Sequence, residues 1–323
     1  PREIASILKL ADDPDPKNRD TRPLMATLMR MKTASSRLAG HILTRRTACT
    51  AFSARMVADG DSADEANAAL ARLKPIIRTV AAHALQSPLY GALAMQVDWS
   101  LIDARWRPRL LKRYKPVDLD QDDAIVHVVS DGQKPVQLAS IPVADHDDTW
   151  IVDTSDDDER GGVLRPILEQ VAMSVDMRRE WANYSRKLKG MLQAVVREGA
   201  TNEEIAEASE ALRNAVTNNF TVRTEAIQMI VDEIVKGSSD SFQQITQALS
   251  AEISIAILGQ ANTSELPAGG GSRAALQILQ LIRADIHYDD MSRIERIVND
   301  QVVLADYRRN YDPGAAAAPW RWE

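Results

Sequence analysis

The sequence GQANTSELPAGGGS, residues 259–272, decides the fold of this chain because it separates two long helical segments. Before it, apolar residues recur at steps of three and four, which places them on one face of a helix over residues 238–259. These residues are Phe242, Ile245, Leu249, Ile253 and Ile257. After it, residues 273–310 predict a second long helix. Three consecutive glycines leave the backbone almost unrestrained, so we predict a mobile loop over residues 260–272.

An apolar stripe on a helix needs a neighbour that covers it. Residues 163–188 provide a second helix, with Leu164, Leu168 and Val171 on one face and Pro166 tolerated in its first turn. We predict that these two helices pair in antiparallel fashion. Their apolar faces exceed what one helical pair can bury, so we also expect the stripe of residues 242–257 to pack against further copies of the chain.

A compact insertion separates the two paired helices. Residues 191–197 predict a strand, Thr201 and Glu204 form a capping-box pattern at the start of a helix, and residues 220–231 predict one or two further strands. The sequence therefore predicts a β-α-β unit at the tip of a helical hairpin.

The N-terminal half combines helices with a small mixed module. Residues 1–20 are polar and contain prolines, which indicates a loop or arm, whereas residues 23–51 and 62–85 have helical periodicity. The run AIVHVVSDGQKPVQL predicts a hairpin with Asp131-Gly132 at its turn. The predicted fold class is therefore mainly α, with a mixed α/β module and a smaller α/β insertion. Trp99 and Trp106 are expected as core anchors of the mixed module.

Composition excludes several classes of protein. The chain has 39 Lys and Arg against 46 Asp and Glu, a net charge of −7, so it lacks the positive charge of a sequence-reading DNA-binding protein. A conduit for DNA stays possible, because a wall that neutralised many phosphates would hinder sliding of the duplex. No apolar run approaches the length of a membrane span, so no membrane partner is expected. Cys49 stands alone, which excludes an internal disulfide, and we expect it to be a buried small apolar residue.

Candidate catalytic, metal and nucleotide sites are weak. The acidic stretch 145–158 includes His146, but it lacks the spacing of a calcium loop and is expected to be a solvated loop. Gly269, Gly270 and Gly271 precede a helix as in a phosphate cradle, but the lysine of nucleotide-binding loops is missing. We expect no enzyme activity, no cofactor and no metal.

Several longer stretches resemble the portal proteins of Mu-like tailed bacteriophages. In chain order, which is also the family's order, they are VDWSLIDARWRPRLLKRY, GGVLRPILEQVAMSVDMRREWANYSRKLKG, residues 252–290 and IVNDQVVLADYRRNY. The element GQANTSELPAGGGSRA is the most specific part. The resemblance covers the chain from about Ala82 onward. Family members usually continue past PWRWE, so we expect part of a C-terminal crown to be absent.

The resemblance implies a portal fold with wing, stem, clip and partial crown. Its parts would be N-terminal helices and a mixed α/β wing (1–160), a first stem helix (161–188), a clip (189–237), a second stem helix (238–259), a tunnel loop (260–272) and a long wing-to-crown helix with a C-terminal tail (273–323). The loop that touches DNA would comprise Ala261, Asn262, Thr263, Ser264, Glu265, Gly269, Gly270, Gly271 and Ser272.

The resemblance also implies partners and a location. The chain would form a homo-oligomeric ring, typically a dodecamer, at one capsid vertex of the virion. Double-stranded DNA would enter and leave through it without sequence specificity. Terminase, head-completion or adaptor proteins and the major capsid protein would contact it, and assembly would take place in the host cytoplasm.

Basic residues cluster near the clip end of the first stem helix: Arg178, Arg179, Arg186, Lys187 and Lys189. Complementation of the dipole at a helix C-terminus, or salt bridges, would explain them without DNA. Repeated around a pore, the same residues would form a basic collar. Two alternatives to a portal stay open: a helical capsid or connector protein that does not enclose DNA and, more remotely, an enzyme of phage DNA metabolism.

Overall fold

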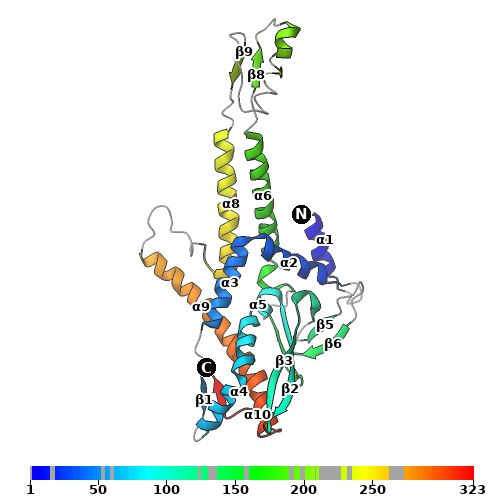
Figure 1. Cartoon of the computed structure of the whole chain (residues 1–323), viewed down its shortest axis with the longest axis vertical. Coiled ribbons are helices and arrows are strands. Elements are labelled where there is room, and N and C mark those ends of the chain that lie inside the picture. Colours follow the sequence, from blue (N-terminus) through cyan, green and yellow to red (C-terminus); the bar gives the residue numbers. More distant parts are fainter. Residues whose placement is uncertain are drawn as a thin grey trace. The chain divides into compact units, whose positions relative to one another are not determined.

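The computed structural model places the chain in two compact units, which are described separately (Figure 1). The larger unit comprises Pro1–Ala172 and Ser250–Glu323, and the smaller comprises residues 173–249. The structure describes residues 2–14, 19–51, 55–58, 62–122, 125–129, 137–155, 160–188, 193–196, 201–207, 209–210, 227–230, 235–261 and 273–323. The predicted fold class is confirmed, because helices dominate and the sheets are small and antiparallel.

The N-terminal part of the larger unit begins with three helices: α1 (Arg2–Ala11), α2 (Arg22–Ala34) and α3 (Ser36–Thr50). The prediction of an arm over residues 1–20 is therefore wrong for its first half. Ile4, Ile7 and Leu8 of α1 pack against the core, which fixes this segment. The single helix predicted over residues 23–51 is also divided. Ser35 adopts an extended backbone, and its hydroxyl accepts a hydrogen bond from the Leu38 N–H at 3.3 Å, which caps α3.

Helix α4 (Ala63–His83) confirms the prediction over residues 62–85, and the short α5 (Gln86–Tyr90) follows it. Strand β1 (Met56–Ala58) pairs in antiparallel fashion with β10 (Trp320–Trp322), which lies at the other end of the sequence. Trp322 is among the largest fully buried side chains. The sequence did not predict this pairing, which closes the larger unit around α4.

The mixed module consists of two three-stranded antiparallel sheets. One has the order β3-β2-β7 and the other β4-β5-β6. Their bounds are β2 (Ala92–Ile102), β3 (Arg105–Arg113), β4 (Leu119–Asp122), β5 (Ile125–Val129), β6 (Gln137–Pro142) and β7 (Trp150–Thr154), with a 3₁₀ turn η1 (Pro116–Asp118) before β4. The predicted pairing of β5 with β6 is confirmed, although the turn at Asp131-Gly132 lies outside the described residues. Trp99 is buried and Trp106 packs against the core, as expected.

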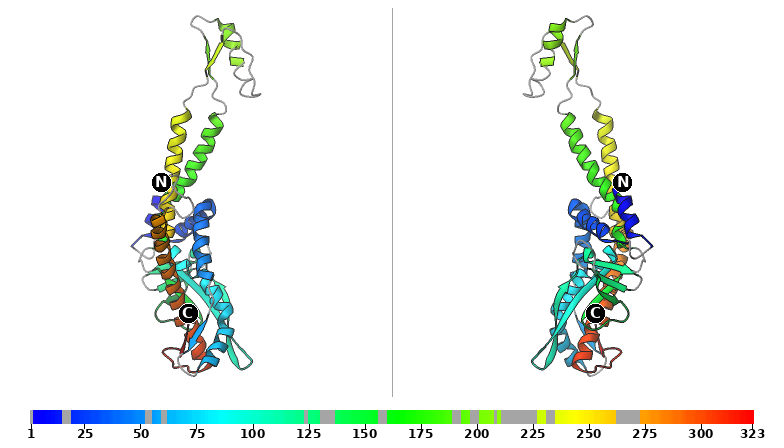
Figure 2. Two further views of the ribbon diagram at one scale, coloured as in Figure 1. Left: turned by 90° about the vertical axis from the view of Figure 1, so that its left-hand side faces the viewer. Right: turned by 90° about the vertical axis from the view of Figure 1, so that its right-hand side faces the viewer.

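A continuous helical spine follows the 260–272 loop. It comprises α9 (Arg273–Val298), a π-helical turn η3 (Asn299–Val303) and α10 (Leu304–Asn310). The long helix predicted over residues 273–310 is confirmed, whereas the π turn inside it was not predicted. The spine lies beside α3 and α4 (Figure 2).

The two predicted stem helices are α6 (Leu168–Leu188) and α8 (Val235–Leu258). Helix α6 begins at Leu168 rather than residue 163, because the preceding chain forms a 3₁₀ turn η2 (Gly162–Leu164) and Pro166 lies before the helix. Within the smaller unit, the rings of Trp181 on α6 and Phe242 on α8 meet edge to face at 5.7 Å between centroids. The predicted pairing of the two helices is thus confirmed there (Figure 1).

The insertion between α6 and α8 contains β8 (Gln193–Val196), helical residues 202–207 and β9 (Ile227–Ile230). The two strands pair in antiparallel fashion. The predicted capping box is present, because the Thr201 N–H donates to Glu204 Oε2 at 2.8 Å and the Glu204 N–H donates to Thr201 Oγ1 at 3.3 Å. The β-α-β order of the prediction therefore holds for the described part of the insertion.

Three buried ion pairs join the spine to the rest of the larger unit. On the spine, Asp290 pairs with Arg45 of α3, Arg293 with Asp153 of β7, and Asp306 with Arg72 of α4, at 2.5, 2.9 and 2.7 Å. The three carboxyl-bearing residues are at most 2% exposed. Burial raises the pKa of Asp306, although its hydrogen bond from Arg72 opposes this effect. Each pair links segments that are far apart in the sequence.

Three amide side chains of the spine extend the edges of the sheets. Gln301 exchanges two hydrogen bonds of 2.8 Å with the backbone N–H and C=O of Val152 on β7. Asn299 pairs in the same way with Trp322 on β10, at 2.8 and 3.1 Å, and Asn310 with Trp106 on β3, at 2.7 and 3.1 Å. Each of these strands lies at a sheet edge. The amides therefore satisfy backbone groups that edge strands would otherwise leave open.

We predict that Asp306→Ala lowers the free energy of unfolding by about 3–5 kcal/mol, because it leaves the buried Arg72 guanidinium without its carboxylate. Chemical denaturation of the purified protein measures this change. Arg107→Ala serves as the control, since it removes an exposed pair with Asp103 and should cost less than about 1 kcal/mol. Equal effects of the two substitutions would contradict the assignment. The double variant Arg72→Met/Asp306→Leu should lose less stability than Asp306→Ala.

Candidate functional site

The 260–272 loop starts from a tightly constrained end of α8. Gly259 has a φ of +72°, and its N–H donates to the Ile255 carbonyl at 2.8 Å, which ends the helix in a left-handed turn. A Cβ added at Gly259 would lie 2.8 Å from side-chain carbons of both Ile282 and Ile286 on α9. Glycine is therefore required here for its conformation and for the close approach of α9.

Helix α3, from the N-terminal part of the sequence, packs against the same end of α8. Arg45 donates from Nε and Nη2 to both oxygens of Asp290 at 2.5 and 2.6 Å, and from Nη1 to the Ile257 carbonyl at 3.5 Å. His41 Nε2 and Ser254 Oγ lie 2.9 Å apart in a buried hydrogen bond. Arg45 therefore forms an ion pair with the spine and also contacts the last turn of α8. We call residues Ser254–Gln260, with Arg45 and Asp290, the loop root.

Cys49 also lies at the loop root and is fully buried, as predicted. Its sulfur is 3.9 Å from Asp290 Oδ2. Burial and the neighbouring carboxylate raise the pKa of the thiol to about 12. The side chain therefore stays protonated at neutral pH and has the character of a packing residue.

Gln260 is the first residue of the 260–272 loop and is still buried. It is 3% exposed, and neither its amide nitrogen nor its amide oxygen has a hydrogen-bond partner in the described part of the chain. Buried amides in native proteins are almost always paired. The partner of Gln260 is therefore expected from the adjoining loop or from another molecule. Ala261 is half-buried, and the remaining loop residues of the prediction, Asn262–Ser272, lie outside the described residues.

The predicted packing stripe on α8 divides between the two units. Ile253 and Ile257 are buried in the core of the chain itself, and Leu249 is also buried. Ile245 is 43% exposed and Phe242 is half-buried against Trp181. The contact with other copies stays a prediction, and Ile245 is the member of the stripe that offers most surface for it.

The predicted basic collar is only partly described. Arg178 and Arg179 are exposed on α6, and Arg179 contacts Asp176 at 3.4 Å, a weak exposed pair. Arg178 lines a cavity of about 320 Å³ with Trp181 and Phe242. The side chains of Arg186 and Lys187, and Lys189 altogether, lie outside the described residues. The collar therefore stays a prediction.

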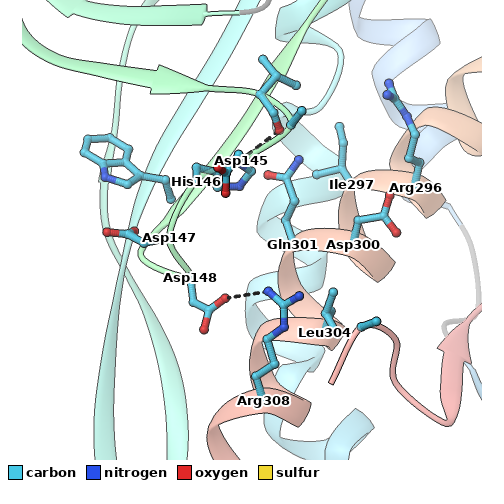
Figure 3. A pocket seen from close by; sticks show the side chains of 14 residues that line it. Asp145, His146, Asp147, Asp148, Arg296, Ile297, Asp300, Gln301, Leu304 and Arg308 are labelled. Atoms are coloured by element: carbon cyan, nitrogen blue, oxygen red, sulfur yellow. Dashed lines mark hydrogen bonds and ion pairs between the residues drawn. The ribbon is translucent and has the colours of Figure 1, made fainter. Parts of the chain in front are cut away.

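The sequence predicts a solvated loop over the acidic stretch 145–158. The structure shows that only part of this stretch is exposed. Asp153 belongs to β7 and is buried between Arg293 and Arg296, with a further hydrogen bond from Ser87. The exposed part lines a cavity of about 520 Å³ against the spine (Figure 3). We call it the acidic cavity; its charged lining residues are Asp145, Asp147, Asp148, Arg296, Asp300 and Arg308, and His146 lies among them.

Most of the basic groups in the acidic cavity are already paired. Asp148 lies 3.8 Å from Arg308 and 3.7 Å from Arg309, and Arg296 contacts Asp153. Asp145 and Asp300 are exposed and have no ion pair in the described part of the chain (Figure 3). Within the described residues, no group of three or more histidine, cysteine or carboxylate side chains is arranged to hold a metal ion.

A second cavity, of about 450 Å³, has the opposite charge. We call it the basic pocket; its cationic lining residues are Lys32, Arg46, Arg113 and Lys115, and His83 lies among them. Arg113 Nη1 contacts both ring nitrogens of His83, with Nδ1 at 3.2 Å, so the ring must accept the hydrogen bond in its neutral form. Burial, followed by Arg113, Arg46 and Lys32, lowers the pKa of His83 to about 4.

None of the helices in the described residues is both long and apolar enough to pass through a membrane.

We predict that Gly259→Ala destabilises the protein by about 1–2 kcal/mol or more, because alanine is strained at positive φ and its Cβ would press against Ile282 and Ile286. Gly40→Ala is the matched control: Gly40 lies within α3 with open space around it, so alanine should stabilise by up to about 1 kcal/mol. Thermal unfolding measures both changes. The same sign for the two variants would contradict the role of Gly259.

We predict a specific acid sensitivity from His83. Its pKa in the folded chain is below its ordinary value, so the unfolded chain binds the proton more readily. The free energy of unfolding should therefore fall as the pH drops from about 6.5 to 4, by an amount on the order of 2 kcal/mol after the shift is discounted for solvent screening at this half-buried site. The groups facing His83 are Lys32, Arg46, Arg113 and Lys115, none of which relieves this effect.

His83→Gln should remove this part of the pH dependence, as measured by denaturation at pH 7 and pH 4. His127→Gln, on β5 and away from the basic pocket, should behave like the unchanged protein. If both variants kept the full acid sensitivity, another group would be responsible.

Comparisons with known proteins agree with this architecture. A family model described as the portal protein of Mu bacteriophage matches residues 25–323. None of the curated proteins matches the chain. Among solved structures, the neck of an empty GTA particle computed with C6 symmetry is similar at a TM-score of 0.53 and 11% identity, covering 93% of this chain and 84% of that chain.

Two further structures are similar. The neck of a native GTA particle computed with C12 symmetry has a TM-score of 0.51 at 11% identity and covers 93% of this chain and 83% of that one. An HK97 family phage portal protein from Corynebacterium diphtheriae has a TM-score of 0.42 at 10% identity, covering 94% and 93%. At these identities the structural likeness concerns the fold, whereas the family model spans the loop root, the stem helices and the spine. The chain therefore belongs to the portal protein family of Mu bacteriophage.

Proposed function

We propose that the chain forms a closed ring at one vertex of a phage head and that double-stranded DNA passes through the ring during packaging and ejection. The observation that carries this proposal is the family match over residues 25–323. The shared fold with a neck computed with C12 symmetry supports a ring of twelve copies. Such a protein serves as a channel and a docking platform and needs no chemical step of its own, so we expect no catalytic activity.

Exposed apolar side chains support association between copies. Ile245 and Ile255 on α8, and Ile278 and Leu281 on α9, are each more than two-fifths exposed. Large apolar groups on two successive helices are costly to leave in water and favour contact with a neighbour. In a ring, α8 and α9 of adjacent copies would cover these groups.

The 260–272 loop is proposed to face the lumen. Its sequence contains one charged residue, Glu265, and no lysine or arginine, so contacts with phosphate would come from backbone N–H groups and from Asn262, Thr263 and Ser264. Such contacts are weak and exchange readily with water. The well-packed loop root supports this assignment, because it would anchor the end of α8 from which the loop starts while the glycines adapt to the passing duplex.

The insertion between α6 and α8 is proposed as the docking surface for the terminase and, after packaging, for head-completion proteins. It is a separate small element with its own strand pair and capped helix, which supports a role in contacts rather than in the core. The major capsid protein would surround the wing. Assembly would take place in the host cytoplasm, and the finished ring would be part of the virion.

The alternative is a helical structural protein of the phage that does not enclose DNA. The family match disfavours it, and electron microscopy of the purified protein separates the two. Rings with a central pore as wide as a DNA duplex are expected. Monomers or closed assemblies without a pore, at concentrations that saturate assembly, would overturn the proposal.

We predict that replacing Gly269, Gly270 and Gly271 by alanine impairs DNA packaging while rings still assemble, because the loop loses conformational freedom. Lysines at positions 264 and 265 should slow translocation, more strongly at low salt, where attraction to phosphate is least screened. Single-molecule packaging rates and ring mass measure the two effects. Gly314→Ala, in the C-terminal tail, is the control and should leave both unchanged. Normal packaging by both loop variants would contradict the placement of the loop in the lumen.

A further inference from the structure

The basic pocket is a concentration of positive charge, and its cations form no ion pair with a carboxylate in the described part of the chain. Its four cations come from α2, α3, the end of β3 and the residue pair that follows β3, and no carboxylate lies among its described lining residues. Asp118 accepts a hydrogen bond from the Lys115 backbone N–H at 3.1 Å but does not line the pocket. Burial and the nearby Arg46 lower the pKa of Lys32, which is consistent with mutual repulsion. This repulsion would be relieved by an anionic occupant.

The shape of the pocket restricts that occupant. Apolar side chains, including Met29, Leu85 and Leu89, line the cavity together with the cations. A duplex carries its phosphates on the outside of a convex helix, with the bases stacked within, so it brings no apolar group to such a concave surface. A protein surface that presents carboxylates beside apolar groups matches both the charge and the apolar part of this lining.

The chain carries a surface with this chemistry. The acidic cavity presents the exposed Asp145, Asp147 and Asp300, beside Val143, Ala144 and Leu304. Figure 2 shows α3, α4 and the β2–β3 hairpin along one side of the larger unit, with α9 and α10 along the other. The basic pocket is built on α2, α3, α4, α5 and the end of β3, whereas the acidic cavity is built on the spine and on residues 143–150. The two opposite charges therefore lie on different sets of elements of one unit.

We propose that the basic pocket of one copy receives the acidic surface around Asp145 and Asp300 of the next copy. This inference rests on the proposed ring. In a ring, each interface joins two different patches, and every copy uses both of its patches once. Charge complementarity of this kind fixes the register between copies and discourages wrong pairings, because like charges brought together are costly.

Charge reversal on each side tests the contact. The pocket variant is Arg113→Glu/Lys115→Glu and the acidic variant is Asp145→Lys/Asp300→Lys; all four residues are exposed, so the fold should be retained, and thermal unfolding checks this. Each variant alone should form rings at least about ten-fold less readily, as measured by native mass spectrometry. Lys9→Glu/Arg30→Glu changes exposed charges elsewhere by the same amount and should assemble normally.

Mixing the two variants gives the decisive result. The reversed pocket of one then meets the reversed acidic surface of the other, and the two unreversed patches also match, so rings of alternating copies should form from the equimolar mixture. Normal rings from either variant alone, or no gain on mixing, would overturn the inference.

Two further outcomes separate the proposals. Loss of binding to a 30-base-pair duplex in the pocket variant, with ring assembly unchanged, would assign the pocket to DNA and overturn the contact between copies. If the unchanged protein formed no rings, the proposed function itself would fail. If it formed rings and charge reversal had no effect, only the present inference would fail.

Discussion

The larger unit depends on the clamping of its helical spine by buried Asp–Arg pairs. Arg45, Arg72 and Asp153 reach the spine from α3, α4 and β7, so elements from three regions of the sequence converge on one helix. Removing such charges from water is expensive, and a well-packed apolar replacement can be equally stable. The pairs therefore contribute most by disfavouring alternative arrangements. A shift of the spine by one helical turn would separate four buried and two partly buried charged groups from these partners.

This clamping has a direct consequence for the loop root. Asp290 holds Arg45, and Arg45 also contacts the last turn of α8 through the Ile257 carbonyl. One side chain thus fixes the helix before the 260–272 loop, the helix after it and α3 at the same point. The helix that leads into the segment proposed to contact DNA is therefore held firmly by the core of the larger unit.

The sequence predicts those features that depend on local patterns. The stripes on α4 and α8, the β5–β6 pairing and the Thr201 capping box were all visible as periodicity or spacing. The break at Ser35 carried a weak signal, a serine before a helical run, but the apolar periodicity continued across it. The ion pairs could not be predicted, because Arg45 and Asp290 are 245 residues apart and nothing in either neighbourhood identifies the partner. For the same reason Asp153 looked like part of a solvated acidic loop, and the two oppositely charged cavities, each built from several elements, were missed.

The π turn shows how a local irregularity serves the long-range arrangement. One extra residue per turn at Asn299–Val303 changes the direction in which successive side chains leave the spine. Asn299 meets the backbone of β10, whereas Gln301, two residues later, meets the backbone of β7 in a different sheet. Each amide supplies a donor and an acceptor, as a neighbouring strand would. The spine thus takes the place that a further strand would have at the edges formed by β7 and β10. The ion pair of Arg293 with Asp153, which is next to Val152, fixes the register between the spine and β7. Displacement of the spine would therefore break hydrogen bonds at the sheet edges together with the ion pairs, which couples the loop root to the sheets through a single rigid element.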